Sequence, residues 1–174
     1  AYNKIADSFD KTRVFAWPGV IKYIDCIDKK DTIIDAGCGN GRNMLPGYKF
    51  TGMDMSESMV KLAKTHTSFP VYQGSILDMP FKDNEFDHCI CIAVLHHLNT
   101  KEKRVNAIKE ICRVIKKTAL ITVWEYDEND KKRNKKDGLI DWTLKDEIVK
   151  RYYHLFEDNE LDSLVEGVSN VKII

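Results

Sequence analysis

The 174-residue chain lacks the features that mark membrane-spanning, disulfide-rich and zinc-binding proteins. Its longest apolar run, residues 89–95, is far shorter than the roughly 20 residues that span a bilayer. No cleavable signal pattern is present near the N-terminus. The 5 cysteines are odd in number and have no Cys-x-x-Cys spacing, which suits buried thiols better than a disulfide framework or a zinc site. These absences predict a soluble protein of the reducing cytoplasm with no membrane partner.

An excess of charge of one sign is also missing. The 27 Lys and Arg residues balance the 27 Asp and Glu residues, so the field of the whole molecule gives no reason to expect a polyanionic partner. The exception is local, because the sequence KKRNKK (131–136) is almost entirely basic. Such a run is usually a solvated loop, but beside a neutral remainder it is the best candidate for a patch that contacts nucleic-acid phosphates.

Hydrophobic periodicity predicts strands that alternate with helices. Strands are expected at 32–36, 49–55, 69–76, 86–94 and 119–126, with a sixth beginning at 171–174. Helices are expected after Pro18, after an N-cap at Ser56, after an N-cap at Asn99 or Thr100, and over 143–166. This alternation predicts an α/β fold with a doubly wound, mostly parallel sheet and helices on both faces, because parallel neighbours need crossover connections.

The length and the 43% share of hydrophobic residues fit a single domain, residues 1–174, with one core. We divide it into an N-terminal lid and helix (1–31), a cofactor-binding core (32–126), and a substrate-side insertion with a C-terminal helix and strand (127–174). The chain opens without Met and stops on an apolar strand. We therefore expect a fragment or an ordered subset of a longer chain, with the last strand of the sheet missing.

A glycine-rich turn, within IIDAGCGNGR (33–42), directly follows the first predicted strand. Gly37, Gly39 and Gly41 allow a tight turn and a close approach of the backbone to a ligand, at the edge of the sheet where such folds bind ligands. A P-loop requires Gly-Lys-Ser/Thr, whereas Gly41 is followed by Arg and Asn. A dinucleotide fingerprint is GxGxxG, whereas the spacing here is GxGxG. Neither nucleotide class fits the turn well.

Two acidic residues point to a different ligand. Asp35, two residues before the first glycine, would repel a pyrophosphate but suits an ammonium group beside a carboxylate. S-adenosylmethionine (SAM) carries both groups. Asp54, at the end of the second strand, is placed to accept the two ribose hydroxyls, and Met55 beside it to pack on the adenine. The alternative is that the turn serves only the path of the chain.

The residues 32–126 resemble the class I SAM-dependent methyltransferases, which have a Rossmann-like fold. IIDAGCGNGR corresponds to their first motif and GMDMSESMV to their second, and QGSILDMPF and FDHCICIAVLHHL are similar to their adenine-binding and post-strand-four segments. The family often has Asp after the glycine of QG, where this chain has Ser75, so the adenine amine is assigned to Ser75, the Ile76 backbone or Asp78. The expected cofactor-binding residues are Tyr2, Arg13, Asp35, Gly37, Gly39, Gly41, Asp54, Met55, Ser75, Ile76 and Ala93.

Three further segments resemble a narrower family, the eukaryotic tRNA methyltransferases that esterify 5-carboxymethyluridine at the wobble position. They are YNKIADSFDKTRVFAWP (2–18), IAVLHHLNTKEKRVNAIKEI (92–111) and RYYHLFEDNELDSLV (151–165). The resemblance implies a tRNA anticodon arm as substrate and a heterodimer with a small zinc-binding activator subunit. Strand 69–76 would be an edge of the sheet, and we expect the activator to pair with it.

A carboxylate acceptor is already ionised at neutral pH, so no general base is required and the expected catalytic residues are positioners. Arg13 and Arg151 would hold the carboxylate or a phosphate, Trp17 and Tyr153 would stack on a base, and His97 would face the site of transfer. Arg13 and Tyr2 also lie in the segment that covers the cofactor in such folds.

Each positioner also has a plainer interpretation. At most one of His96 and His97 is expected to face the site, Trp17 and Tyr153 are also compatible with packing, and Arg151 with a surface ion pair. Two other functions remain open at the level of sequence. One is a methyltransferase of a small molecule such as a quinone or sterol precursor, and the other is a non-catalytic scaffold with the same fold.

Overall fold

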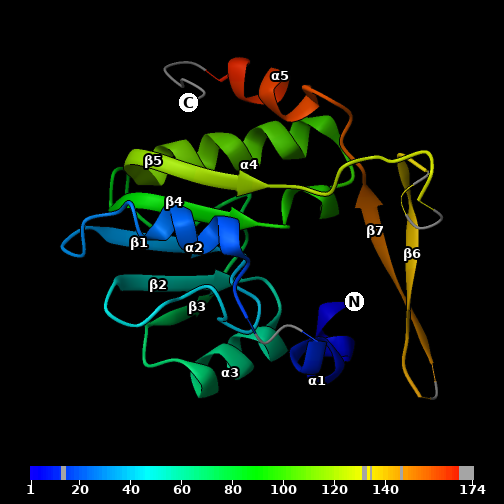
Figure 1. The fold of residues 1–174 in the computed structure, drawn as a ribbon, viewed down its shortest axis with the longest axis horizontal. Helices are drawn as coiled ribbons and strands as arrows, with labels where there is room; N and C mark the ends of the chain where they lie inside the picture. The colour runs from blue at the N-terminus through cyan, green and yellow to red at the C-terminus, as the bar shows by residue number, and fades with distance from the viewer. Residues whose placement is uncertain (13–14, 131–132, 134, 146, 169–174) are drawn as a thin grey trace.

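The computed structural model describes residues 1–12, 15–130, 133, 135–145 and 147–168. Its elements are α1 (Tyr2–Thr12), α2 (Pro18–Ile24), β1 (Thr32–Ala36), β2 (Lys49–Asp54), α3 (Glu57–His66), β3 (Val71–Gln73), β4 (Phe86–Ile92), the 3-10 turn η1 (Leu95–His97), α4 (Lys101–Val114), β5 (Ile115–Thr122), β6 (Asp137–Thr143), β7 (Ile148–His154) and α5 (Glu160–Glu166) (Figure 1). The first five strands form a parallel sheet in the order β3-β2-β1-β4-β5. The predicted doubly wound α/β fold is confirmed.

Consecutive residues of the central strands supply two apolar layers. Ile34 and Cys89 pack with α4 and α5 on one face of the sheet, whereas their neighbours Ile33 and Ile90 pack with α2 and α3 on the other. All four side chains are fully buried. Strands buried on both faces must be apolar at every position, which is why 86–94 reads as one continuous hydrophobic run. The cysteines of this run are buried thiols, as predicted, and burial raises the pKa of Cys89 and Cys91 above the usual range.

Two helices begin at the predicted caps. The Ser56 hydroxyl accepts from the Met59 N–H at 3.3 Å, and the Thr100 hydroxyl accepts from the Lys103 N–H at 3.3 Å. Thr100 is therefore the cap of α4, and Asn99 is not. Among the described residues, no helix is long and apolar enough to cross a bilayer.

The prediction of a helix over 143–166 is wrong for most of its length. Residues 137–143 and 148–154 form the antiparallel ribbon β6-β7, and only residues 160–166 are helical. Val149, Arg151 and Tyr153 alternate with the more exposed Lys150 and Tyr152, so the buried residues repeat every second position. The predicted strand at 171–174 lies outside the described residues.

Two predicted strands differ in extent from the structure. β5 covers Ile115–Thr122, four residues earlier than predicted, because it begins directly where α4 ends. β3 is only Val71–Gln73, shorter than the predicted 69–76, and it is an edge of the five-stranded sheet, as expected.

Helix α1 lies between α3 and the ribbon, beside the carboxyl ends of the strands (Figure 1). The Ser56 hydroxyl donates to Asn3 Oδ1 at 2.6 Å, which ties α1 to the start of α3. On the other side, Trp142 Nε1 donates to the Ser8 hydroxyl at 3.1 Å. The helix thus joins the ribbon to the sheet domain on the side where ligands are expected.

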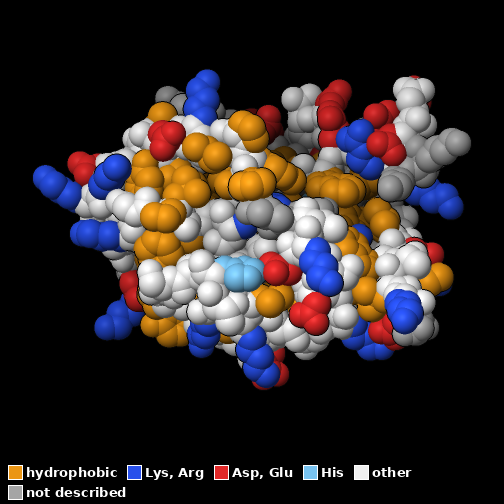
Figure 2. Space-filling model, turned by 60° about the horizontal axis from the view of Figure 1, so that its bottom comes forward, with side chains coloured by type: hydrophobic (Ala, Val, Ile, Leu, Met, Phe, Trp, Pro, Cys, Tyr) orange, Lys and Arg blue, Asp and Glu red, His pale blue; other side chains and the backbone are white. Residues whose placement is uncertain are grey.

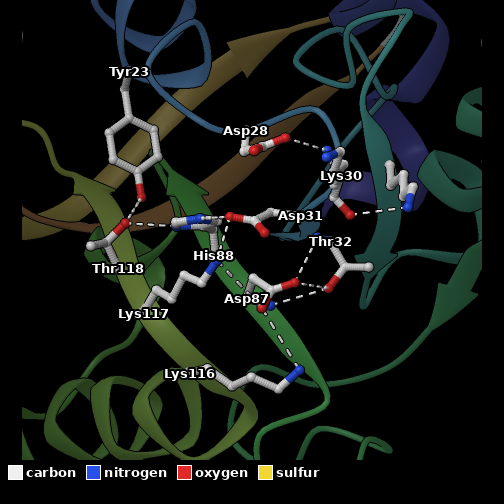
Figure 3. A network of polar contacts seen from close by, with 11 residues as sticks. Tyr23, Asp28, Lys30, Asp31, Thr32, Asp87, His88, Lys116, Lys117 and Thr118 are labelled. Atoms are coloured by element: carbon white, nitrogen blue, oxygen red, sulfur yellow. Dashed lines mark hydrogen bonds and ion pairs between the residues drawn. The ribbon is translucent and has the colours of Figure 1, made fainter.

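A polar network occupies the opposite, amino-terminal end of the sheet (Figure 3). His88 of β4 bonds Asp31 Oδ2 at 3.1 Å through Nε2 and Thr118 Oγ1 at 2.8 Å through Nδ1. Lys117 Nζ also donates to Asp31, at 2.6 Å. Lys117 first, and then His88, hold the pKa of Asp31 below its ordinary value. The network links the residue before β1 to β4 and β5.

Candidate active site

A cavity of about 390 Å³ lies at the carboxyl ends of β1, β2 and β4. Its size is within the range of small-molecule sites. The expected site residues on its wall are Tyr2, Trp17, Gly37, Gly39, Asp54, Met55, Ser75, Ile76, Ala93, His97, Arg151 and Tyr153. Asp35 and Gly41 lie behind the wall rather than on it, and Arg13 lies outside the described residues.

The backbone conformation of the turn requires glycine at two of its positions. Gly37 has φ 87° and Gly41 has φ 84°, which side-chain-bearing residues rarely adopt. A Cβ at Gly37 would lie 2.3 Å from Val94 Cγ2, and one at Gly41 would lie 2.8 Å from Thr67 Cγ2. Gly37 therefore lets the turn pass directly against the segment that follows β4, and Gly41 lets it close on α3.

Asp54 is held rigidly at the end of β2. Its Oδ2 accepts from the Gly39 N–H at 2.9 Å and its Oδ1 from the Ser56 N–H at 2.8 Å. Each oxygen keeps a further lone pair, so the carboxylate can accept two more hydrogen bonds from the cavity. Burial raises the pKa of Asp54, and the two backbone donors oppose that rise. The arrangement suits a pair of neighbouring hydroxyls, as on a ribose.

Asp35 is fully buried beneath the turn, and neither carboxylate oxygen has a hydrogen-bond partner among the described residues. Burial, and then the charge of Asp54, raise the pKa of Asp35 to about 8, while Arg42 opposes the rise. A buried acid without a donor is costly unless a cation neutralises it. This orphaned carboxylate, together with the acceptors on Asp54, fits a ligand with an ammonium group and a ribose, as SAM has.

The adenine end of the cavity has fewer fixed contacts. Met55 is 74% exposed, so its side chain is free to cover a flat ring, and Ile76 is buried on the wall. The Ser75 hydroxyl accepts from the Leu77 N–H at 3.2 Å. Among Ser75, Ile76 and Asp78, only the first two line the cavity.

The far end of the cavity is built around Arg151 of β7. The residue is 7% exposed, its Nη1 donates to the Tyr153 hydroxyl at 2.7 Å, and its Nε has no hydrogen-bond partner among the described residues. The guanidinium lies 4.7 Å from the ring centre of Trp142 and 6.0 Å from that of Tyr2. No described carboxylate pairs with it, so the plainer prediction of a surface ion pair is wrong.

The two histidines after β4 both line the cavity, although at most one was expected to do so. His97 Nδ1 bonds the Tyr152 carbonyl at 2.9 Å, so this nitrogen carries the proton, and Nε2 accepts from the Tyr2 hydroxyl at 2.6 Å. Burial lowers the pKa of His97 to about 4, so the ring is neutral at pH 7. His97 therefore holds the first residue of α1 over the cavity.

The two aromatic positioners differ in exposure. Trp17 is 40% exposed on the cavity wall, with the Arg42 guanidinium 5.4 Å from its ring centre. Tyr153 is 4% exposed, and His96 stacks on its ring. Trp17 keeps an accessible face for a base, whereas for Tyr153 the structure favours the packing interpretation.

Sequence reasoning missed two tryptophans of this site. Trp142 was hidden because its segment lies beside the wrongly predicted helix, and Trp124 follows β5 and lines the cavity. Their signal in the sequence is weak, because an isolated tryptophan next to charged residues is equally typical of surface packing.

The described part of the basic run is largely paired. Arg133 contacts Asp130 at 2.9 Å and Asp127 at 3.2 Å, and Lys136 contacts Glu157 at 2.5 Å. Lys135 is exposed and has no such partner among the described residues. On the face seen in Figure 2, Lys and Arg side chains are likewise scattered among acidic ones. Lys131, Lys132 and Asn134 lie outside the described residues.

Comparisons with known proteins bear on the whole site. Residues 34–123 match the model of the methyltransferase domain family. The chain is 30% identical to a tRNA (carboxymethyluridine(34)-5-O)-methyltransferase of Schizosaccharomyces pombe, over 95% of this chain and 84% of the relative. It is 27% identical to the enzyme of the same name in Xenopus tropicalis, over 99% of this chain but only 37% of that longer relative.

Solved structures share the fold. A SAM-dependent methyltransferase of Methanosarcina mazei superposes with a TM-score of 0.75 at 22% identity, over 88% of this chain and 84% of that chain. A chain of a Haloferax volcanii complex that contains the Trm112 methyltransferase activator superposes with a TM-score of 0.63 at 25% identity, over 74% of this chain and 62% of that chain. On this evidence, the chain belongs to the family of class I SAM-dependent methyltransferases that includes the tRNA (carboxymethyluridine(34)-5-O)-methyltransferases.

Proposed function

We propose that this protein transfers the methyl group of SAM to the carboxylate of 5-carboxymethyluridine at wobble position 34 of tRNA, giving the methyl ester. The names of the relatives in fission yeast and frog support the substrate. The observation that carries the proposal is Arg151, a buried cation on the cavity wall for which the described residues supply no anion. A carboxylate acceptor would complete the pair.

The energetics favour an anionic acceptor. A buried charge without a partner costs several kcal/mol, roughly 3–5 when a partner is removed from a buried pair. The guanidinium can bind both oxygens of a carboxylate in one plane, and Trp142 and Tyr2 pack around it. A neutral small-molecule acceptor would leave Arg151 unpaired in the complex.

The chemistry asks little of the protein beyond orientation. Bound SAM supplies a methyl group on a positively charged sulfur, and a carboxylate needs no base because it is ionised at neutral pH. Arg151 would hold the acceptor, Asp54 and Asp35 would hold the ribose and ammonium ends of the cofactor, and Tyr2 would close the cavity against water. His97, neutral at pH 7, adds no competing positive charge beside Arg151.

We also propose that the chain works with a small zinc-binding activator, which pairs with the exposed edge of β3. Among the described strands, β3 pairs with β2 alone, and Tyr72 in the middle of β3 is 50% exposed. The Haloferax volcanii neighbour comes from a complex with an activator. Full stability and full activity of the isolated chain would contradict this part of the proposal.

The test is incubation of the protein with labelled SAM and total tRNA that lacks the ester, with and without the activator. We expect label at the wobble nucleoside that is released by mild base, as a methyl ester is. Label in base-stable form, or in a lipid extract offered in parallel, would overturn the proposal and favour the small-molecule alternative.

A further inference from the structure

His96 has a free polar edge on the cavity wall. Its Nδ1 lies 3.3 Å from the backbone N–H of Trp124, while Nε2 has no hydrogen-bond partner among the described residues. The ring is 1% exposed and lines the cavity. A polar atom without a protein partner on the wall of a ligand-sized cavity is available to hydrogen-bond a ligand there.

The backbone contact fixes which nitrogen of His96 carries its proton. A backbone N–H can only donate, so Nδ1 must accept. Burial, followed by the neighbouring ring of His97 and then the charge of Arg151, lowers the pKa of His96 to about 2, which keeps the ring neutral. The single ring proton is therefore on Nε2, and the free edge of His96 is a hydrogen-bond donor.

Tyr153 joins this donor to Arg151. The His96 and Tyr153 rings stack with centres 4.9 Å apart and planes 12° apart. The hydroxyl of the same tyrosine accepts from Arg151 Nη1 at 2.7 Å. His96 and Arg151 are thus fixed by one side chain on the same cavity wall, and His96 Nε2 and Arg151 Nε have no hydrogen-bond partner among the described residues.

We infer that His96, and not His97, is the histidine that contacts the acceptor, with its Nε2–H donating to the carboxylate that Arg151 holds. This inference rests on the proposed function. His97 has the opposite tautomer, with Nδ1–H on the Tyr152 carbonyl and Nε2 on the Tyr2 hydroxyl, so both of its nitrogens are used. His97 instead holds α1 over the cavity through the Tyr2 hydroxyl.

Two substitutions of His96 separate this role from a packing role. His96→Asn keeps an oxygen near the position of Nδ1, where it can still accept from Trp124, but has no group at the position of Nε2. His96→Gln places an amide near Nε2 and loses the Trp124 contact. If His96 binds the acceptor, Gln is the better replacement, and if it only packs, Asn is.

The variants are compared in methylation of 5-carboxymethyluridine-containing tRNA, with the activator present. We expect His96→Asn to lower kcat/KM for tRNA at least about ten-fold, as for loss of a hydrogen bond to a charged group, and His96→Gln to recover most of it. SAM affinity is expected to stay unchanged in both. His97→Asn is the matched control, which should weaken SAM binding through Tyr2.

Equal or better activity of His96→Asn than of His96→Gln, at similar melting temperatures, would overturn the inference while leaving the proposed function intact. Absence of any wobble methylation by the wild type would instead overturn both. An independent readout is the ¹⁵N spectrum of the free protein at pH 7, which should report a protonated Nε2 for His96 and a protonated Nδ1 for His97. The same tautomer in both rings would also contradict the inference.

Discussion

The two ends of the parallel sheet treat charged groups in opposite ways. At the amino end, Asp31 contacts both His88 and Lys117, and Asp87 accepts from the backbone N–H and the hydroxyl of Thr32 at 2.9 and 3.0 Å. At the carboxyl end, Asp35 has no described donor and Arg151 no described anion, although both are buried.

The difference separates groups that stabilise the fold from groups that wait for a ligand. Lys117 and His88 hold the pKa of Asp31 below its ordinary value, and the backbone N–H of Thr32 does the same for Asp87, so the folded state favours both ionised forms. The pKa of Asp35 moves the other way, to about 8. Substitutions at the amino end should therefore cost stability, and those at the carboxyl end should cost binding and activity.

The largest effect is expected for Arg151→Met. Loss of hydrogen bonds from a charged group to the acceptor, roughly 1.5–3 kcal/mol, should lower kcat/KM for tRNA about 100-fold. The folded protein should be no less stable, because the variant removes an unpaired buried charge and keeps the volume of the side chain. Initial rates at varied tRNA concentration and a thermal melt without ligand measure the two effects.

Arg151→Lys is the control that keeps the positive charge but lacks the planar guanidinium. It should retain more activity than Arg151→Met but less than the wild type. A large fall in melting temperature for Arg151→Met would mean that the guanidinium is a structural partner of Trp142 and Tyr153. The contrast between the two ends of the sheet would then fail at this residue.

Asp35→Asn should have the next largest effect, on SAM affinity. Asp35 is the buried carboxylate that a bound ammonium would neutralise, and loss of such a charged partner costs roughly 2 kcal/mol, or about 30-fold in the dissociation constant. Calorimetric titration with SAM measures it directly. Binding of adenosine, which has no ammonium, should change little and serves as the control ligand.

The same residue should make stability depend on pH. Its pKa is about 8 in the folded protein, against an ordinary value of 3.8, so between about pH 4 and 8 the folded state binds a proton that the unfolded state has released. The contribution of Asp35 to stability is therefore present below pH 4 and is lost as the pH rises to 8. Ligand-free melts of wild type and Asp35→Asn should diverge over this window, and parallel curves would contradict the raised pKa.

A smaller effect, on stability rather than on binding, is expected for His88→Phe. The ring is kept, but the bonds to Asp31 and Thr118 are lost, which should destabilise the fold by roughly 1–3 kcal/mol and lower the melting temperature by roughly 2 to 10 °C. SAM affinity should be unchanged, because His88 is at the far end of β4 from the cavity. An unchanged melting temperature together with weaker SAM binding would reverse the comparison.

The parts of the fold that were predictable are those encoded locally. The apolar run 86–94, the glycines of the turn and the caps at Ser56 and Thr100 each carry their own signal, and the sheet follows from their order. The ribbon β6-β7 was not predictable in this way. Apart from Val149, its buried residues, Arg151 among them, are polar or aromatic, and they are buried because α1 and the cavity wall lie against them.

The site residues likewise fall into those encoded locally and those set by distant contacts. Asp54 and the glycine turn could be assigned from the sequence because they are adjacent to strand ends. The tautomers of His96 and His97 could not be assigned from the sequence. They are set by backbone groups of Trp124 and Tyr152, which lie 28 and 55 residues away along the chain. The isolation of Arg151 is likewise a property of the assembled cavity.

The smallest effect is expected in the basic run, where the same comparison applies to exposed charges. Lys135 has no described ion pair, so Lys135→Ala should reduce the salt dependence of tRNA binding by about one unit of slope, with SAM affinity intact. Lys136 already faces Glu157, so Lys136→Ala should change the slope less, and Glu157→Gln, which frees Lys136, should increase it. Filter binding at several salt concentrations measures these slopes. Equal slopes in all three variants would mean that tRNA phosphates do not contact this run, and that pairing among its surface charges has no bearing on substrate binding.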